Sequence, residues 1–171
     1  MVDHILSEQQ RLKQDEADDS LFYLQPRFVH HLDEGFRLNL SNLYRERIPK
    51  ESILLDLMSS WVSHLPQEIK YKRVIGHGLN QAELERNHSL NTFWIQDLNR
   101  DKKLPLENSS IDFCLMVAAW QYLQYPEEIV AEIFRVLSIK GKIIVSFSNR
   151  AFWTKTPNVW RNGTDNDHIE Y

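Results

Sequence analysis

The chain has 171 residues, 42% of them hydrophobic and 26% charged, with a formal net charge of −4, which fits a single folded domain. No apolar run approaches the ~18 residues of a membrane span, no basic stripe indicates nucleic-acid binding, and no CxxC, HExxH or DxDxDG motif indicates a metal site. The first residues lack a secretory signal and the single Cys114 suits a reducing compartment, so we expect a cytoplasmic protein without metal, membrane or nucleic-acid partners.

Glycine is scarce in this sequence. There are five glycines in 171 residues, against a usual fraction of about 7%. Only Gly76 and Gly78 have a G-x-G spacing. The composition therefore disfavours functions that depend on a glycine-rich phosphate loop.

The first 50 residues divide into a polar part and an amphipathic part. Residues 1–20 end in an acidic run at 15–20, which predicts a flexible, solvated acidic arm. Residues 21–50 predict a helical lid, with a helix that has Pro26 at its first position and ends before Pro49. Its apolar positions follow steps of three and four: Phe28, Val29, Leu32, Phe36, Leu40, Leu43 and Tyr44.

The pattern after residue 50 is modular. Five short apolar runs predict buried strands: 53–58, 73–76, 93–96, 111–117 and 142–147. Their spacing leaves room for crossovers, which favours βαβ units and a parallel sheet.

Helix signals lie between these runs. Asn80 and Glu83 form a capping-box pattern, and Pro66 ends a short helical segment after Met58. Pro126 begins a helix with one apolar face, and a turn at 140–141 then leads into the last strand. That face comprises Ile129, Val130, Ile133, Phe134 and Leu137.

Polar residues follow the carboxyl end of each predicted strand. In an open parallel sheet these ends share one edge, where ligands bind. The sequence therefore predicts a small-molecule pocket at this edge.

Several segments together resemble the class I S-adenosylmethionine-dependent methyltransferases, in the branch called type 11. They are residues 54–57, 74–76, 97–98 with 104–112, and 135–137 with 141–145. The resemblance covers about residues 52–148 and rests on the order and spacing of these segments. It implies a methyltransferase-like α/β domain over 51–171, with a Rossmann-like, mostly parallel sheet. The strand order we expect is 3-2-1-4-5.

The same resemblance implies S-adenosylmethionine as the cofactor and places its site. Asp56 would lie near the methionine end, and Asp97 would accept a hydrogen bond from the adenine amino group, with Leu98 beside it. The cofactor-binding set is Asp56, Met58, Ser59, Ser60, Gly78, Leu79, Asp97, Leu98 and Ala118. Two simpler interpretations stay open: Asp56 caps the turn at residues 59–60, and Asp97 caps the loop 97–103.

The sequence departs from the family pattern at two positions. The first loop is glycine-rich in the family, whereas this chain has Met58, Ser60 and Val62 there. The second strand usually ends in an acidic residue that contacts the ribose, whereas this chain has Gly78. Asn80 either substitutes for that acid or caps the following helix.

The methyl acceptor is predicted to be a small molecule, because the loop after the fourth strand lacks an Asn-Pro-Pro-Tyr motif. No catalytic residue is assigned. Tyr23, His30, His31 and Tyr44 are candidates for contact with the acceptor.

Residues 150–171 have room for one short helix and none for a hairpin. The resemblance implies two further strands after the fifth, so we expect either a truncated C-terminus or a fifth strand that is an edge, open or covered by the tail or a partner, which favours self-association. Two other functions stay open. One is a cofactor-free binding or scaffold protein of the same fold. The other is a nicotinamide-binding domain, although this sequence has no G-x-G-x-x-G motif after the first strand.

Overall fold

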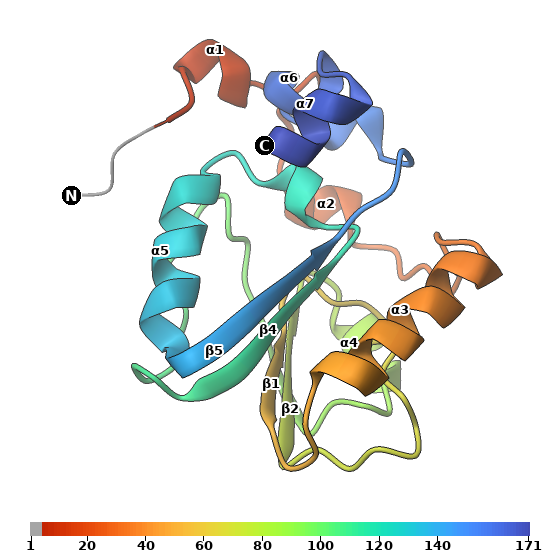
Figure 1. The fold of residues 1–171 in the computed structure, drawn as a ribbon. Helices are drawn as coiled ribbons and strands as arrows, with labels where there is room; N and C mark the ends of the chain where they lie inside the picture. The colour runs from red at the N-terminus through yellow and green to blue at the C-terminus, as the bar shows by residue number, and fades with distance from the viewer. Residues whose placement is uncertain (1–4) are drawn as a thin grey trace.

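The centre of the structure is a five-stranded sheet (Figure 1), seen in a computed structural model that describes residues 5–171. The strands are β1 (Ile53–Asp56), β2 (Arg73–Gly78), β3 (Thr92–Ile95), β4 (Ile111–Val117) and β5 (Leu137–Ser146). They lie in the order β3-β2-β1-β4-β5, and every neighbouring pair is parallel. The predicted Rossmann-like fold and strand order are confirmed.

The two faces of the sheet bury alternate residues of the central strands. Leu54 of β1 lies in a cluster with Tyr44 of α3 (Glu34–Arg47) on one face. Leu55 lies in a cluster with Ile129 of α5 (Pro126–Val136) on the other. This alternation follows from the two-residue period of a strand. Figure 1 shows α5 on one side of the sheet and α3 and α4 on the other.

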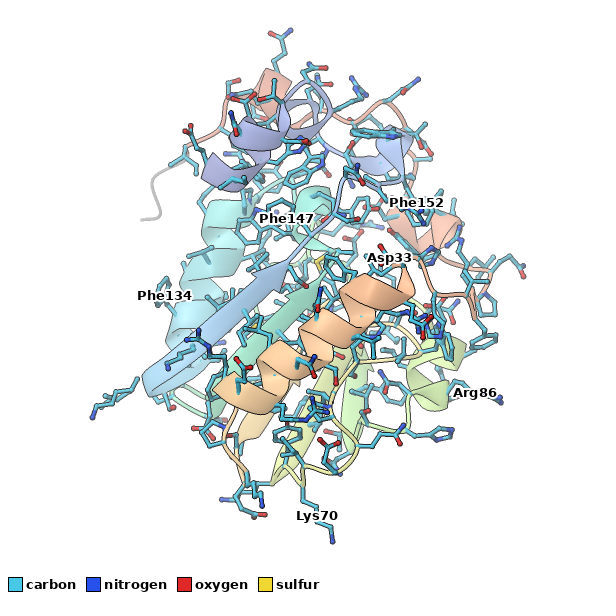
Figure 2. The ribbon with its side chains drawn as sticks, turned by 45° about the vertical axis from the view of Figure 1, so that its right-hand side comes forward. Asp33, Lys70, Arg86, Phe134, Phe147 and Phe152 are labelled. Atoms are coloured by element: carbon cyan, nitrogen blue, oxygen red, sulfur yellow. The ribbon has the colours of Figure 1, made fainter. Side chains whose placement is uncertain are left out.

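The helices predicted from their caps are present. Asn80 caps α4 (Gln81–Arg86), with its side chain accepting from the Glu83 N–H at 3.0 Å, and α5 begins at Pro126. The predicted apolar face of α5 is wrong at one position. Phe134 is 70% exposed and points away from the sheet (Figure 2). Val136 is buried instead, because α5 presents positions 129, 133 and 136 to the strands.

The predicted helix after Pro26 is shorter than expected, because α3 begins only at Glu34. The Asp33 side chain caps it by accepting from the Phe36 N–H. The chain before it is irregular because its backbone bonds elsewhere: the Arg27 N–H donates to Glu83, and the Val29 carbonyl accepts from Trp61.

The connection between β1 and β2 also differs from the prediction. Residues 57–72 contain turns but no helix, so the short helical segment before Pro66 is absent. The two strands are still parallel neighbours. The crossover between them is therefore an irregular loop, and its first residues face the carboxyl edge of the sheet.

The two ends of the described chain pack together above that edge (Figure 1). The short elements involved are α1 (Glu8–Arg11), α2 (Asp19–Phe22), η1 (Trp120–Tyr122), η2 (Trp153–Lys155), α6 (Asn158–Arg161) and α7 (Asp165–Glu170). Lys13 forms an antiparallel bridge with Pro157, and the Asn158 N–H donates to the Leu12 carbonyl. The tail therefore holds two short helices and a 3-10 turn, where we expected one helix.

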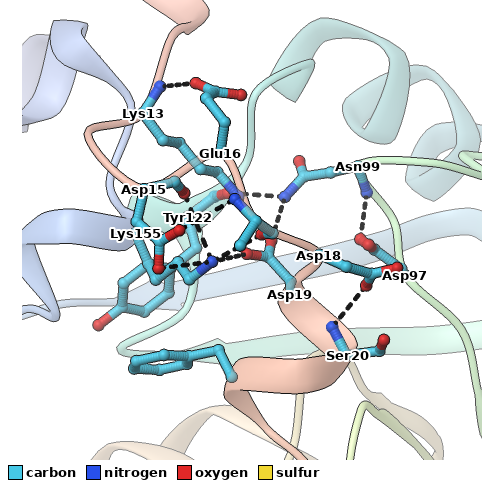
Figure 3. Close-up of polar contacts among 12 residues, drawn as sticks. Lys13, Asp15, Glu16, Asp18, Asp19, Ser20, Asp97, Asn99, Tyr122 and Lys155 are labelled. Atoms are coloured by element: carbon cyan, nitrogen blue, oxygen red, sulfur yellow. Dashed lines mark hydrogen bonds and ion pairs between the residues drawn. The ribbon is translucent and has the colours of Figure 1, made fainter.

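A buried ion-pair network joins these ends (Figure 3). Asp19 pairs with Lys13 at 2.5 Å and with Lys155 at 3.3 Å, and Lys155 also pairs with Asp15 at 3.1 Å. Asn99, in the loop after β3, donates to Asp19. Residues 1–4 of the predicted acidic arm lie outside the described residues. Within 5–20 the prediction of a solvated segment is wrong for Arg11, Lys13 and Asp19, which are buried.

The last strand is an edge of the sheet. Within residues 5–171, β5 pairs only with β4, and Ile139 on it is 91% exposed. The expected turn at 140–141 lies inside β5 as an irregularity, with Lys140 at a φ of 70°. The tail covers the carboxyl edge rather than this strand, and pairing of β5 with a second copy stays a prediction.

Replacement of Asp19 by alanine is expected to lower the free energy of unfolding by about 3–5 kcal/mol, because it leaves the buried ammonium group of Lys13 without its carboxylate and removes one of the two carboxylates that pair with Lys155. Urea denaturation measures this. Arg100→Ala is the control, because it breaks the more exposed pair with Asp18 and exposed pairs contribute little. Equal effects of the two variants would contradict the assignment of Asp19 as the centre of the network.

Candidate functional site

A cavity of about 410 Å³ opens at the carboxyl ends of the strands, within the roughly 300–1,000 Å³ of small-molecule sites. Its floor comes from the loops after β1, β2, β3 and β4, and its roof from residues between 19 and 32 and from 148–152. All nine predicted cofactor-binding residues line it: Asp56, Met58, Ser59, Ser60, Gly78, Leu79, Asp97, Leu98 and Ala118. The structure brings these residues together, and their contact with a cofactor stays a prediction.

Three of the four candidates for acceptor contact also line the cavity: Tyr23, His30 and His31. The fourth, Tyr44, is fully buried between α3 and the sheet and does not reach the cavity. Its place on the inner face of α3 follows from the same apolar periodicity that predicted the helix.

Asp56, the last residue of β1, is 2% exposed. The Ser59 hydroxyl donates to its Oδ2 at 2.6 Å. Burial raises the pKa of this carboxyl from 3.8 to about 6, although hydrogen bonds from Ser59 and Ser63 act in the opposite direction. Asp56 therefore contacts the turn at residues 59–60 through the Ser59 hydroxyl, and its carboxylate is a strongly desolvated group at the cavity wall.

The loop after β1 is held against the end of β2. The Ser59 N–H donates to the His77 carbonyl at 2.6 Å. A Cβ atom at Gly78 would lie 2.6 Å from the Ser59 carbonyl oxygen, which is too close for any side chain. Gly78 therefore occupies the place of the family's acidic residue because the neighbouring backbone needs that space.

Three of the six non-glycine residues with positive φ in the described chain line the cavity. Met58, His64 and Ala118 have φ values of 57°, 56° and 50°, and all three line it. Such conformations cost energy for residues with a side chain and occur preferentially at functional sites. They are fixed by tertiary contacts, so no local sequence signal predicts them.

Asp97, directly after β3, is half-buried. Its Oδ1 accepts from the Asn99 N–H at 2.9 Å, which confirms that it stabilises the start of the loop 97–103. Oδ2 accepts no hydrogen bond from the described residues. Burial raises the pKa of this carboxyl, and the nearby carboxylate of Asp19 adds to the effect.

Asn80 caps α4, as one of its two interpretations predicted, and both hydrogens of its side-chain amide are bonded as well. Its oxygen caps α4, and its amide group donates to the Tyr23 and Leu24 carbonyls at 2.8 and 3.1 Å. The neighbouring Glu83 accepts from the Ser60 hydroxyl at 2.5 Å and from the Arg27 N–H at 2.7 Å. The start of α4 therefore anchors the roof of the cavity.

The roof also has an aromatic part that was not predicted from the sequence. The Phe152 ring lies 5.5 Å from the His31 ring and 6.1 Å from the Tyr122 ring, and the Arg27 guanidinium lies 5.4 Å from its centre. These residues come from the lid segment, the loop after β4 and the tail. The sequence signal for this packing is the aromatic content of residues 150–171, which include Phe152, Trp153 and Trp160.

His77 was also missed, although it lines the cavity and is buried. Burial lowers the pKa of its imidazole to about 4, so the ring is neutral at neutral pH. The Gly76-His77-Gly78 spacing drew attention to the glycines rather than to the residue between them.

Comparison with known proteins agrees with this architecture. The family model described as "Methyltransferase domain" matches residues 58–145, just over half of the chain. A search of curated protein sequences gives no match.

Solved structures match at low sequence identity. The complex between the Haloferax volcanii Trm112 methyltransferase activator and a methyltransferase matches with a TM-score of 0.54 and 18% identity, over 64% of this chain and 50% of that one. An S-adenosylmethionine-dependent methyltransferase from Mesorhizobium loti matches with a TM-score of 0.50 and 19% identity, over 61% of this chain and 50% of that one. The cyclase SpnF matches with a TM-score of 0.51 and 19% identity, over 63% of this chain and 43% of that one. The chain spans about half the length of these solved chains.

The strand order defines a Rossmann-like α/β domain, with a cavity at the carboxyl edge of its sheet. More narrowly, the chain belongs to the methyltransferase-domain family, in the type 11 branch of the class I S-adenosylmethionine-dependent methyltransferases. In residues 5–171 no helix is long and apolar enough to cross a membrane. The same residues contain no group of three or more His, Cys, Asp or Glu side chains that would hold a metal ion.

Replacement of Gly78 by alanine is expected to destabilise the protein by about 1–3 kcal/mol, the usual effect of overpacking, because the new Cβ meets a backbone carbonyl. The matched control is Gly76→Ala in the same strand, where the atoms nearest to the new Cβ would belong to the Leu90 side chain rather than to the backbone. Thermal denaturation and the amide NMR signals of Met58 and Ser59 measure the effect. A smaller loss for Gly78→Ala than for Gly76→Ala would contradict the close approach.

Proposed function

We propose that this chain binds S-adenosylmethionine in the cavity and transfers its methyl group to a small-molecule acceptor. The observation that supports this most directly is the pair of carboxylates at the edge of the sheet, Asp56 after β1 and Asp97 after β3, in one cavity. When bound, the cofactor supplies a methyl group on a sulfonium centre that is open to in-line displacement.

The two carboxylates suit the two ends of an extended nucleoside. Because β2 lies between β1 and β3, the strand ends are about 10 Å apart, twice the usual spacing of neighbouring strands. Asp56 would pair with the amino group at the methionine end. Asp97 has a free Oδ2 that would accept from the adenine amino group, and Leu79 and Leu98 would pack against the apolar parts between them.

The loop after β1 retains donors for the carboxylate of the cofactor. The N–H groups of Ser60, Trp61 and Val62 donate no hydrogen bond within the described residues, and all three residues line the cavity. Successive backbone N–H groups bind an anion when they point to a common centre, and we propose that these three do so when the cofactor is bound. They would replace the glycine-rich turn of the family.

The roof suits a small acceptor rather than a macromolecular one. Residues of the lid and the tail close over the cavity, with Arg150 donating to the His31 carbonyl and Phe152 packing against the Tyr23 ring. Burial lowers the pKa of His31 and raises that of Tyr23, so both side chains are neutral at neutral pH. They would orient an acceptor by hydrogen bonding. Methyl transfer depends mainly on such positioning.

Asp97→Asn is expected to weaken S-adenosylhomocysteine binding about tenfold or more. An asparagine still accepts from the Asn99 N–H and keeps the turn, but its amide group opposes the adenine amino group, which removes a charge-assisted hydrogen bond of about 1.5–3 kcal/mol. Isothermal titration calorimetry measures the affinity. Equal affinity in the variant would mean that Asp97 only shapes its loop, and no binding to the unaltered protein would favour the cofactor-free scaffold.

The buried carboxyl of Asp56 predicts a pH dependence of stability. Its pKa in the folded protein, about 6, is above its ordinary value of 3.8, so the folded state binds this proton more tightly than the unfolded state does. Its stabilising contribution is full below pH 3.8 and is lost as the pH rises through 6, by about 3 kcal/mol.

Asp56→Asn is therefore expected to be more stable than the unaltered protein above pH 6 and equal to it near pH 3.5, as measured by urea denaturation. A ligand ammonium would favour the ionised carboxylate, so S-adenosylhomocysteine binding should tighten between pH 5 and 7 only when Asp56 is present. If Asp56→Asn binds S-adenosylhomocysteine with the same pH dependence as the unaltered protein, Asp56 does not contact the ligand.

A further inference from the structure

His77 connects the ends of three strands through one buried side chain. Its Nδ1 accepts from the Met58 N–H at 3.1 Å, and its Nε2 lies 2.8 Å from the Gln96 carbonyl. A backbone N–H donates only to an unprotonated nitrogen and a carbonyl accepts only from N–H, so the ring is the neutral tautomer with hydrogen on Nε2. The loop after β1 is thereby tied to β2 and to the residue that precedes Asp97.

The loop that His77 holds has no regular structure to support it. Residues 57–72 contain no helix, and Met58 has a φ of 57°, a left-handed conformation that costs energy for a residue with a Cβ atom. In a glycine-rich loop that conformation would need no support. Here the Met58 N–H and the Ser59 N–H both bond to His77, one to the ring and one to the carbonyl.

We propose that His77 is a positioning residue for the loop after β1: its ring nitrogen Nδ1 holds Met58 in the left-handed conformation, which leaves the amides of residues 60–62 unbonded at the cavity. His77 itself does not bind the ligand through its ring, because both ring nitrogens are occupied. This inference rests on the proposed function for its effect on cofactor affinity. The effect of His77 on the conformation of Met58 does not depend on any ligand.

A purely space-filling role would give different predictions. The His77 ring also packs against Trp94, with ring centres 5.0 Å apart. If packing alone mattered, any side chain of similar size would serve, and the position of the hydrogen-bond acceptor would be irrelevant.

Two variants separate these roles. His77→Asn keeps an oxygen where Nδ1 lies and so retains an acceptor for the Met58 N–H. His77→Gln places its amide where Nε2 lies and retains only the contact with the Gln96 carbonyl. Ile129→Val is the control for general destabilisation, because Ile129 of α5 is fully buried in the core and does not line the cavity.

The first measurement is amide hydrogen exchange of Met58 and Ser59 by NMR, without ligand. We expect the Met58 amide to stay protected in His77→Asn and to exchange at least tenfold faster in His77→Gln. Equal protection of the Met58 amide in the two variants would overturn the proposal, even if the protein binds no cofactor.

The second measurement is S-adenosylhomocysteine affinity by calorimetry, together with the melting temperature of each variant. We expect affinity within about threefold of the unaltered protein for His77→Asn and Ile129→Val, and at least tenfold weaker for His77→Gln. A loss that follows the melting temperature across all three variants would overturn the positioning role. If the unaltered protein does not bind S-adenosylhomocysteine, the proposed function is rejected. The hydrogen-exchange measurement alone then tests whether His77 positions Met58.

Discussion

The candidate site depends on the close approach of the loop after β1 to the end of β2. The Ser59 carbonyl lies where a side chain of residue 78 would be, so only glycine fits there. That approach lets Ser59 bond to both Asp56 and the His77 carbonyl. It also places the Ser60 hydroxyl against Glu83, so the same contact extends from the sheet to α4 and the lid.

A methyltransferase-family fold with few glycines thus has another way to form its first loop. In a glycine-rich loop the backbone turns without steric cost. Here Met58 makes the turn at a cost, which hydrogen bonds from the Met58 and Ser59 N–H groups to His77 would offset. The cyclase SpnF shares this fold, which illustrates that the fold does not fix the reaction. The chemistry therefore has to be argued from the side chains in the cavity.

The sequence was sufficient for the sheet and for most of the floor of the site. Buried parallel strands such as β4 are short apolar runs with a fixed spacing, and the residues after them, including Asp56 and Asp97, must converge at one edge. The roof was not predictable in the same way. Residues 26–33 carry a helical pattern, yet the bonds of Arg27 to Glu83 and of Val29 to Trp61 come from segments far away in the chain. The ion pair of Asp19 with Lys155 joins opposite ends of the sequence for the same reason.

The most direct test of this account is a crystal structure of the protein with S-adenosylhomocysteine. We predict that the adenine amino group lies within hydrogen-bond distance of Asp97 Oδ2, that the ligand ammonium lies beside Asp56, and that the ligand carboxylate contacts the amides of residues 60–62. A ligand bound elsewhere, or a cavity that remains empty at saturating ligand, would contradict the assignment of this cavity as a cofactor site.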